Sequence, residues 1–273
     1  MSEKPEARTP RFLAWLYSTP SQQPVLASLC GIEREVGASL RPGVDHHVAH
    51  TRLEWWRAEC ARCAAGNPVH PLTRELRMHV EQLAPADRAH SLLCGVAGLV
   101  DTAAWDLASA TFARREELTA YCRRWAEAMV APISWGPPDE LGTTLCELEL
   151  LGRLAHDARS GRLRLPLDEL ERAAVAPQAL ASPPWPPELA QIIGGRHRAL
   201  RQQLAAAVAS LSPQAQQSAR GLLVWAALAW QGSIRAERAL PRSSTASLAS
   251  AAAANWCAWR AARAAAAGRL RLG

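Results

Sequence analysis

The chain has 273 residues, of which 49% are hydrophobic and 21% charged, and its formal net charge at pH 7 is +6. These ordinary values exclude a disordered protein, a collagen and a membrane-spanning bundle. The length suffices to bury a large core without disulfides or a structural metal. The longest apolar stretch, residues 221–230, is too short to cross a bilayer.

A helical pattern runs along almost the whole chain. Apolar residues recur three and four positions apart, β-branched residues are sparse, and no segment reads convincingly as a strand. In chain order, the pattern predicts helices over residues 10–16, 24–40, 48–65, 71–82, 86–109, 115–133, 140–159, 167–171, 187–211, 213–237 and 247–270.

Proline and glycine interrupt this pattern at residues 41–43, 66–68, 135–138 and 181–187. Apolar helices of similar character flank the proline-rich 181–187 connector, so we interpret it as a stiff loop within one bundle. We therefore expect a single all-α domain over residues 10–270. A flexible N-terminus at residues 1–9 and a frayed end at residues 270–273 complete this prediction.

The seven cysteines are odd in number and lie within apolar helical patterns rather than in loops. This usage is typical of a reduced compartment, and the charged first ten residues lack the apolar core of a signal peptide, so we expect a cytoplasmic protein. Cys60 and Cys63 have CxxC spacing but lie in mid-helix without a second pair, which favours a structural role. His46 and His50 have a spacing that can chelate a transition metal, but we favour a solvated loop entering a helix.

Residues 157–170 carry an acid, a basic glycine turn and a helix that starts with proline. Carboxylates bind hard cations and guanidinium groups bind phosphate oxygens, so Asp157 with Arg159, Arg162 and Arg164 suits a diphosphate and its Mg²⁺. A solvated basic turn between two helices is the simpler interpretation of the same residues.

A second distinctive stretch places adjacent tryptophans, Trp55 and Trp56, on an amphipathic helix that ends at a Gly-Asn-Pro-Val-His-Pro turn. Taken by itself, this pattern indicates a packed helix followed by a turn that ends it. Together with the 157–170 segment, however, it resembles the squalene/phytoene synthase family, all-helical prenyltransferases that join two prenyl diphosphates head to head. The resemblance covers almost the whole chain, and its most specific parts are Arg-Leu-Glu-Trp-Trp at 52–56, Glu-Leu-Thr-Ala-Tyr-Cys at 117–122 and Asp-Ala-Arg-Ser-Gly-Arg-Leu-Arg-Leu-Pro at 157–166.

The resemblance implies an isoprenoid-synthase-type bundle around a central, largely apolar cavity. In active members, two aspartate-rich motifs on facing helices hold the Mg²⁺ ions that bind the substrate diphosphates. Here the first motif is replaced by Glu33-Arg34-Glu35, and acids two residues apart point to different faces of a helix. In the second motif Arg153 replaces an aspartate and would repel Mg²⁺, so that only Asp157 remains acidic. Arg164 stands where the family usually has tyrosine.

These departures favour a degenerate member of the family, similar to the branch that includes assembly factors for respiratory complex I. We expect a non-catalytic module, with no cofactor, that binds a prenyl or other lipid-like ligand or a protein partner. The alternative is an active Mg²⁺-dependent prenyltransferase that condenses two prenyl diphosphates. For that alternative, the resemblance implies Asp157, Glu33 and Glu35 as metal ligands. It likewise implies a substrate-binding set of Arg52, Tyr121, Arg159 and Arg162.

The C-terminal residues 247–273 form an alanine-rich segment with tryptophan and arginine on one helix, namely Trp256, Trp259, Arg260, Arg263, Arg269 and Arg271. A helix that closes the bundle is the favoured interpretation. The functional alternative is a peripheral contact with an anionic surface of the inner membrane, where tryptophan lies at the headgroups and arginine meets phosphate. We expect no nucleic-acid partner, because the basic residues form no continuous stripe interleaved with aromatic ones.

Overall fold

The computed structural model describes residues 4–6, 9–41, 43–134, 139–243 and 251–273. These residues form helices, short turns and loops without any strand, which confirms the all-α prediction. The helices are α1 Pro10–Tyr17, α2 Gln22–Gly37, α3 His46–Ala65, α4 Pro71–Leu83, α5 Ala86–Gly95, α6 Gly98–Leu107, α7 Arg115–Met129, α8 Asp139–Gly152, α9 Leu154–Arg159, α10 Leu167–Arg172, α11 Pro187–Ala209, α12 Pro213–Ser218, α13 Arg220–Ala239 and α14 Ala251–Ala266.

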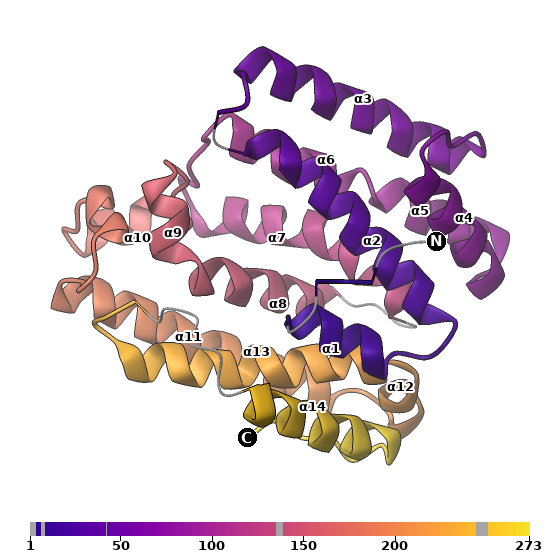
Figure 1. Ribbon diagram of the computed structural model, residues 1–273. Helices are drawn as coiled ribbons and strands as arrows, with labels where there is room; N and C mark the ends of the chain where they lie inside the picture. Colours follow the sequence, from indigo (N-terminus) through magenta and orange to yellow (C-terminus); the bar gives the residue numbers. More distant parts are fainter. Residues whose placement is uncertain (1–3, 7–8, 42, 135–138, 244–250) are drawn as a thin grey trace.

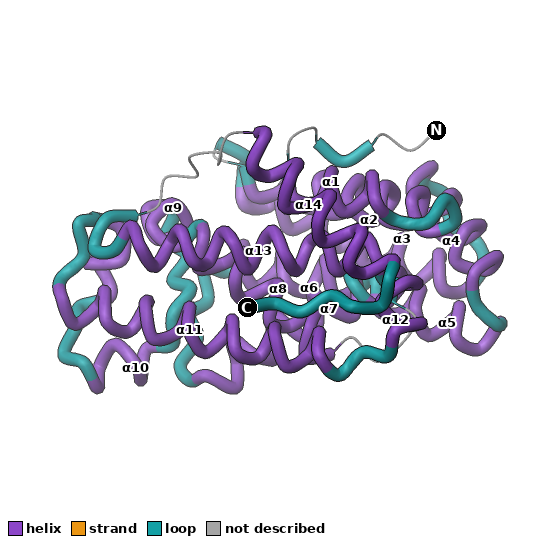
Figure 2. The backbone as a smooth tube through the Cα atoms, turned by 90° about the horizontal axis from the view of Figure 1, so that it is seen from below, coloured by secondary structure: helices purple, strands orange, loops and turns teal. Residues whose placement is uncertain are grey.

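The helices pack in a bundle in which α6, α7, α8 and α11 follow one another from top to bottom of Figure 1. Helix α2 crosses this layer, and α13 carries both α1 and α14. Seen from below, α1 and α14 lie on one side of the bundle and α10 and α11 on the other (Figure 2). Within the described ranges, none of the helices combines the length with the apolarity that crossing a membrane requires.

Three predicted helices are each divided in two. The 86–109 helix breaks between α5 and α6, where α6 approaches α7 so closely that a Cβ on Gly98 would lie 2.3 Å from the Arg124 carbonyl oxygen. The 140–159 helix breaks at Arg153, and the 213–237 helix breaks at Ala219. The apolar spacing continues through these kinks, so periodicity alone predicted single long helices. The predicted break at 135–138 and the start of the 247–270 helix lie outside the described residues.

The end of the chain is held by α12, so the prediction that residues 270–273 fray was wrong at Leu270. Leu270 is buried, its N–H donates to Gln216 Oε1 at 2.8 Å, and its carbonyl accepts from Gln216 Nε2 at 3.4 Å. The flexible segment predicted at 1–9 stays a prediction. Of its described residues, Pro5 is buried and the Thr9 hydroxyl accepts a hydrogen bond from the N–H of Phe12 at the start of α1.

Helix α1 lies directly on α13 because residue 221 has no side chain. A Cβ on Gly221 would lie 2.0 Å from Ser18 Oγ and 2.5 Å from the Ala14 carbonyl oxygen. Next to this contact, Arg220 Nε donates to the Tyr17 carbonyl at 2.8 Å. The close approach fixes the position of α1, which carries Arg11 towards the centre of the bundle.

The segment with Trp55 and Trp56 is a packed helix that ends at the Gly-Asn-Pro-Val-His-Pro turn, as the sequence indicates. Gly66 caps the end of helix α3 with a φ of +99°, which suits glycine. The Trp56 side chain is buried, and its ring centroid lies 4.8 Å from that of His70. The fully buried Glu59 carboxylate accepts hydrogen bonds from the N–H groups of Val69 and His70, both at 2.9 Å, and from the Thr73 hydroxyl. Glu59 therefore ties the turn after α3 to the helix itself.

The CxxC pair also has the environment of structural residues. Cys60 and Cys63 are buried free thiols, and burial raises the pKa of Cys60 to about 12 and that of Cys63 to about 11. Such thiols carry almost no thiolate at neutral pH, which disfavours metal binding and redox chemistry. His46 and His50 are exposed at the start of α3, where His50 Nε2 lies 3.8 Å from Glu54.

Candidate functional site

A cavity of about 660 Å³ lies between α1, α2, α6, α7, α8 and the turn after α9. Val36, Leu40, Leu99 and Leu150 give it an apolar wall. Twelve of its 27 described lining residues carry a formal charge, so charged groups share the lining with the apolar surface that was predicted. Most of these charged residues belong to two clusters.

The turn after α9 directs two arginines back towards the cavity. Helix α9 ends at Arg159 and is capped by Ser160, and Gly161 has a φ of +77° that lets the chain reverse. The Arg162 N–H then donates to the Asp157 carbonyl at 2.9 Å. The predicted glycine turn is therefore present. Its tip at residues 159–161 is exposed, as expected of a solvated turn, whereas Arg164 returns into the bundle and is 4% exposed.

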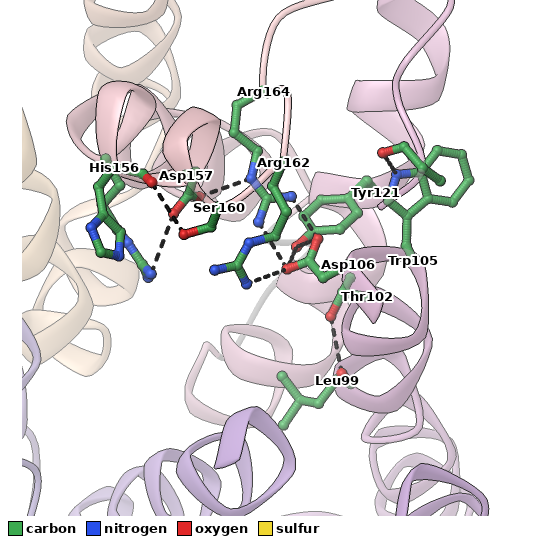
Figure 3. A network of polar contacts seen from close by, with 12 residues as sticks. Leu99, Thr102, Trp105, Asp106, Tyr121, His156, Asp157, Ser160, Arg162 and Arg164 are labelled. Atoms are coloured by element: carbon green, nitrogen blue, oxygen red, sulfur yellow. Dashed lines mark hydrogen bonds and ion pairs between the residues drawn. The ribbon is translucent and has the colours of Figure 1, made fainter. Parts of the chain in front are cut away.

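Arg164 bridges two aspartates from different helices (Figure 3). Its Nη1 and Nη2 donate to the two carboxylate oxygens of Asp106 on α6, at 2.6 and 2.8 Å. Its Nε donates to Asp157 Oδ2 on α9 at 2.9 Å, and Asp157 is 1% exposed. Burial disfavours the charge on Arg164, but the hydrogen bonds to Asp106 outweigh burial and raise the pKa of Arg164.

Tyr121 and two further arginines surround this bridge. The Tyr121 hydroxyl lies 3.4 Å from both Asp106 oxygens, and burial raises the pKa of Tyr121 well above its usual value. Arg162 Nη1 lies 3.9 Å from Asp106 Oδ2, while Arg162 Nε is buried and finds no hydrogen-bond partner among the described residues. Arg153 Nη2 lies 3.5 Å from Asp157 Oδ1 and its side chain is 63% exposed. Three guanidinium groups therefore face two carboxylates at this end of the cavity.

Arg11 forms a second bridge, between α2 and α8. Its Nη1 donates to Glu33 Oε2 on α2, and its Nη2 donates to Glu149 Oε2 on α8 at 2.6 Å. Each of these carboxylates also accepts a hydrogen bond from an indole N–H group. Trp125 donates to Glu33 at 2.9 Å, and Trp225 donates to Glu149 at 3.1 Å.

The same tryptophans flank the Arg11 guanidinium, which lies 5.4 Å from the ring of Trp125 and 5.2 Å from that of Trp225. Burial disfavours the charged form, but the Glu149 carboxylate more than compensates and raises the pKa of Arg11. Arg11 therefore stays charged between its two glutamates.

The oxygen ligands available in this cavity do not suit Mg²⁺. A magnesium ion prefers octahedral oxygen ligands from ionised carboxylates and water. All four bridged carboxylates, those of Glu33, Asp106, Glu149 and Asp157, already accept hydrogen bonds from an internal guanidinium group. Within the described ranges, no three His, Cys, Asp or Glu side chains are grouped as a metal site would need.

The structure brings together four of the predicted site residues and leaves three apart. Glu33, Tyr121, Asp157 and Arg162 line the cavity, whereas Glu35, Arg52 and Arg159 are not among its described lining residues. Arg159 Nε instead donates to the Ala181 carbonyl at 3.1 Å. The separation of Glu33 from Glu35 agrees with the prediction that they point to different faces of a helix.

Sequence reasoning missed Arg11, Asp106 and Glu149 as site residues, and it did not give Arg164 its bridging role. One signal could have found Asp106. It continues the face of Leu99, Thr102 and Ala103 at helical spacing, and all four residues line the cavity. An acid on an otherwise apolar helix face indicates a buried partner or a site.

Comparison with known protein families decides the classification, since the squalene/phytoene synthase profile matches residues 5–253. The chain belongs to the squalene/phytoene synthase family. Comparison with curated proteins finds no match.

Two solved structures share the fold. A dehydrosqualene synthase determined in complex with a ligand is 13% identical, with a TM-score of 0.73 over 92% of this chain and 89% of its own. Squalene synthase HpnC from Alicyclobacillus acidocaldarius is 16% identical, with a TM-score of 0.64 over 83% of this chain and 87% of its own. Identities this low establish a common fold and nothing about activity. The expected isoprenoid-synthase-type bundle is confirmed.

Proposed function

We propose that this squalene/phytoene synthase-family protein is a non-catalytic module that binds a prenyl diphosphate or a similar amphiphile in its cavity. The observation that carries the proposal is the pairing of the cavity carboxylates with Arg11 and Arg164. Ionisation of a prenyl diphosphate in active relatives depends on metal ions that neutralise the departing oxygens. Carboxylates already bonded to arginine are poor ligands for such ions, whereas a basic cavity with an apolar wall suits an anionic head and an apolar tail.

An active prenyltransferase is the second candidate. Asp106, Tyr121 and Asp157 lie at one end of the cavity, and this arrangement favours it. A protein partner bound at the cavity rim, as in an assembly factor, would use the same fold without a lipid ligand.

Incubation of the purified protein with Mg²⁺ and farnesyl diphosphate tests the proposal. We expect saturable binding of farnesyl diphosphate in isothermal titration calorimetry, no hydrocarbon product and no release of inorganic diphosphate. Product formation that is abolished by Asp157→Ala would establish the prenyltransferase instead. Absence of both binding and product would contradict the ligand class and favour the protein partner.

We further propose that α14 contacts an anionic membrane surface at the periphery of the inner membrane, from the cytoplasmic side. Its alanine face is buried against the bundle at Ala258, Ala261, Ala262 and Ala265, which confirms a closing helix. On its other face Trp256 and Trp259 are 59% and 38% exposed, and the centroids of their rings lie 4.8 Å apart. Arg263 lies 4.9 Å from the Trp259 ring, so cationic and indole groups share one surface.

Co-sedimentation with phosphatidylglycerol vesicles tests the α14 surface. Replacing Trp256 and Trp259 together by alanine is expected to lower the pelleted fraction severalfold, because two indoles leave the interface. Substitution is preferable to truncation, since the end of the chain at Leu270 is buried. Trp55→Ala on α3, which removes another exposed tryptophan (43%), is the matched control. Equal pelleting of the double variant and the control would contradict the proposal.

A further inference from the structure

The two arginine bridges in the cavity wall share one geometry. Each places one cation between two carboxylates that come from two different helices. Arg11 joins α2 to α8 through Glu33 and Glu149, and Arg164 joins α6 to α9 through Asp106 and Asp157. A divalent metal ion can bridge carboxylates of two facing helices in the same way. The difference is that a metal ion comes from solution, whereas the guanidinium belongs to the chain.

We infer that Arg11 and Arg164 replace divalent cations in this cavity, so that it holds an anionic head group without any metal ion. The inference rests on the proposed function, because it concerns how the same cavity binds its ligand. Guanidinium groups stay charged at all physiological pH values and cannot be removed by a chelator. The neutralising charges are therefore a permanent part of the chain.

The excess of basic groups indicates where the head group binds. The described lining of the cavity has seven basic and five acidic side chains, which leaves a formal excess of two positive charges. At the α9 end, Arg153, Arg162 and Arg164 face two carboxylates of the described residues, those of Asp106 and Asp157. This end therefore attracts an anion, and a phosphate-type group matches the guanidinium fork.

Arg162 is the best-placed ligand for that anion. Its side chain is 18% exposed, its closest approach to Asp106 is 3.9 Å, and its buried Nε has no hydrogen-bond partner in the described part of the chain. A buried donor without a partner is costly. A phosphate oxygen can contact the exposed part of this side chain, since Nε itself is shielded from solvent. Arg164, by contrast, has committed its Nε, Nη1 and Nη2 to two aspartates.

Calorimetric titration of farnesyl diphosphate in EDTA, and again in excess Mg²⁺, tests the metal independence. We expect dissociation constants that agree within about twofold, because no metal bridges the ligand to the cavity. Binding that is at least tenfold tighter in Mg²⁺ would overturn this inference and leave the proposed ligand class standing. Absence of binding in both buffers would overturn the inference and the proposed function together.

A pair of arginine variants tests the position of the head group, with all titrations in EDTA. Arg162→Gln is expected to weaken farnesyl diphosphate binding by about tenfold, because one charge-assisted contact is lost. Arg172→Gln on α10 is the matched control, since Arg172 is 69% exposed, pairs with Asp168 and is not among the cavity-lining residues. Thermal unfolding of each variant verifies that it is folded. Wild-type affinity in folded Arg162→Gln would overturn the assignment.

Discussion

Replacing Arg164 by methionine is expected to lower the free energy of unfolding by about 3–5 kcal/mol. The substitution keeps an unbranched apolar stem in place of the arginine methylenes and removes the cation that serves Asp106 and Asp157, of which Asp157 is 1% exposed. A buried carboxylate without its partner retains the full cost of desolvation. Urea denaturation followed by circular dichroism measures the change.

Two further variants separate the buried charge from a simple loss of packing. Arg172→Met removes an exposed arginine from α10 and should change the free energy of unfolding by less than about 0.5 kcal/mol. Adding Asp157→Asn to Arg164→Met should restore part of the lost stability, because one uncompensated charge is removed. A loss below about 1 kcal/mol in Arg164→Met would contradict the role that we assign to the bridge.

Glu59→Ala should destabilise the protein by a similar amount, about 3–5 kcal/mol. Its fully buried carboxylate accepts hydrogen bonds from the N–H groups of Val69 and His70 and from the hydroxyl of Thr73, and the substitution removes all three. The same urea denaturation measures the effect. Glu54→Ala, on the exposed face of the same helix, is the control and should have little effect.

The contribution of Glu59 should also depend on pH. Burial alone would raise the pKa of Glu59, but hydrogen bonds from Thr73 and from the His70 N–H outweigh it and lower the pKa below 4.5. A lowered native pKa stabilises the fold above the unfolded pKa, and this stabilisation is lost as the pH falls through the native pKa. The difference in unfolding free energy between wild type and Glu59→Gln should therefore be largest above about pH 4.5 and shrink as the pH falls below it. A constant difference would contradict the assignment.

The fold was predictable from the sequence because helix signals are local. Thr9 before Pro10 and Asp45 before His46 are caps, and their side chains accept hydrogen bonds from the first turns of α1 and α3. Kinks such as that at Arg153 depend on how neighbouring helices pack, so the sequence around them carries no clear sign of the break. The end at Leu270 was mispredicted for the same reason, since its partner Gln216 lies far away in the chain.

The site was predictable only in part. The motif around Asp157 indicated an acid beside arginines, and the replacement of an aspartate by Arg153 indicated a weakened metal site. The sequence did not reveal that Asp157 is itself bonded to Arg164, which also binds Asp106, 58 positions earlier in the chain. Nor did it pair Arg11 with Glu149, 138 positions away. Long-range partners such as these are fixed by tertiary packing, which helix periodicity does not encode.

The absent side chain at Gly221 has an effect well beyond its own contact. Because Ser18 and Ala14 rest against this position, any larger residue there would push α1 outward and draw Arg11 away from its glutamates. A residue outside the cavity would thus alter the electrostatic potential inside it. Substitutions at the contact between α1 and α13 should therefore change ligand affinity, as should substitutions of the groups that touch the ligand.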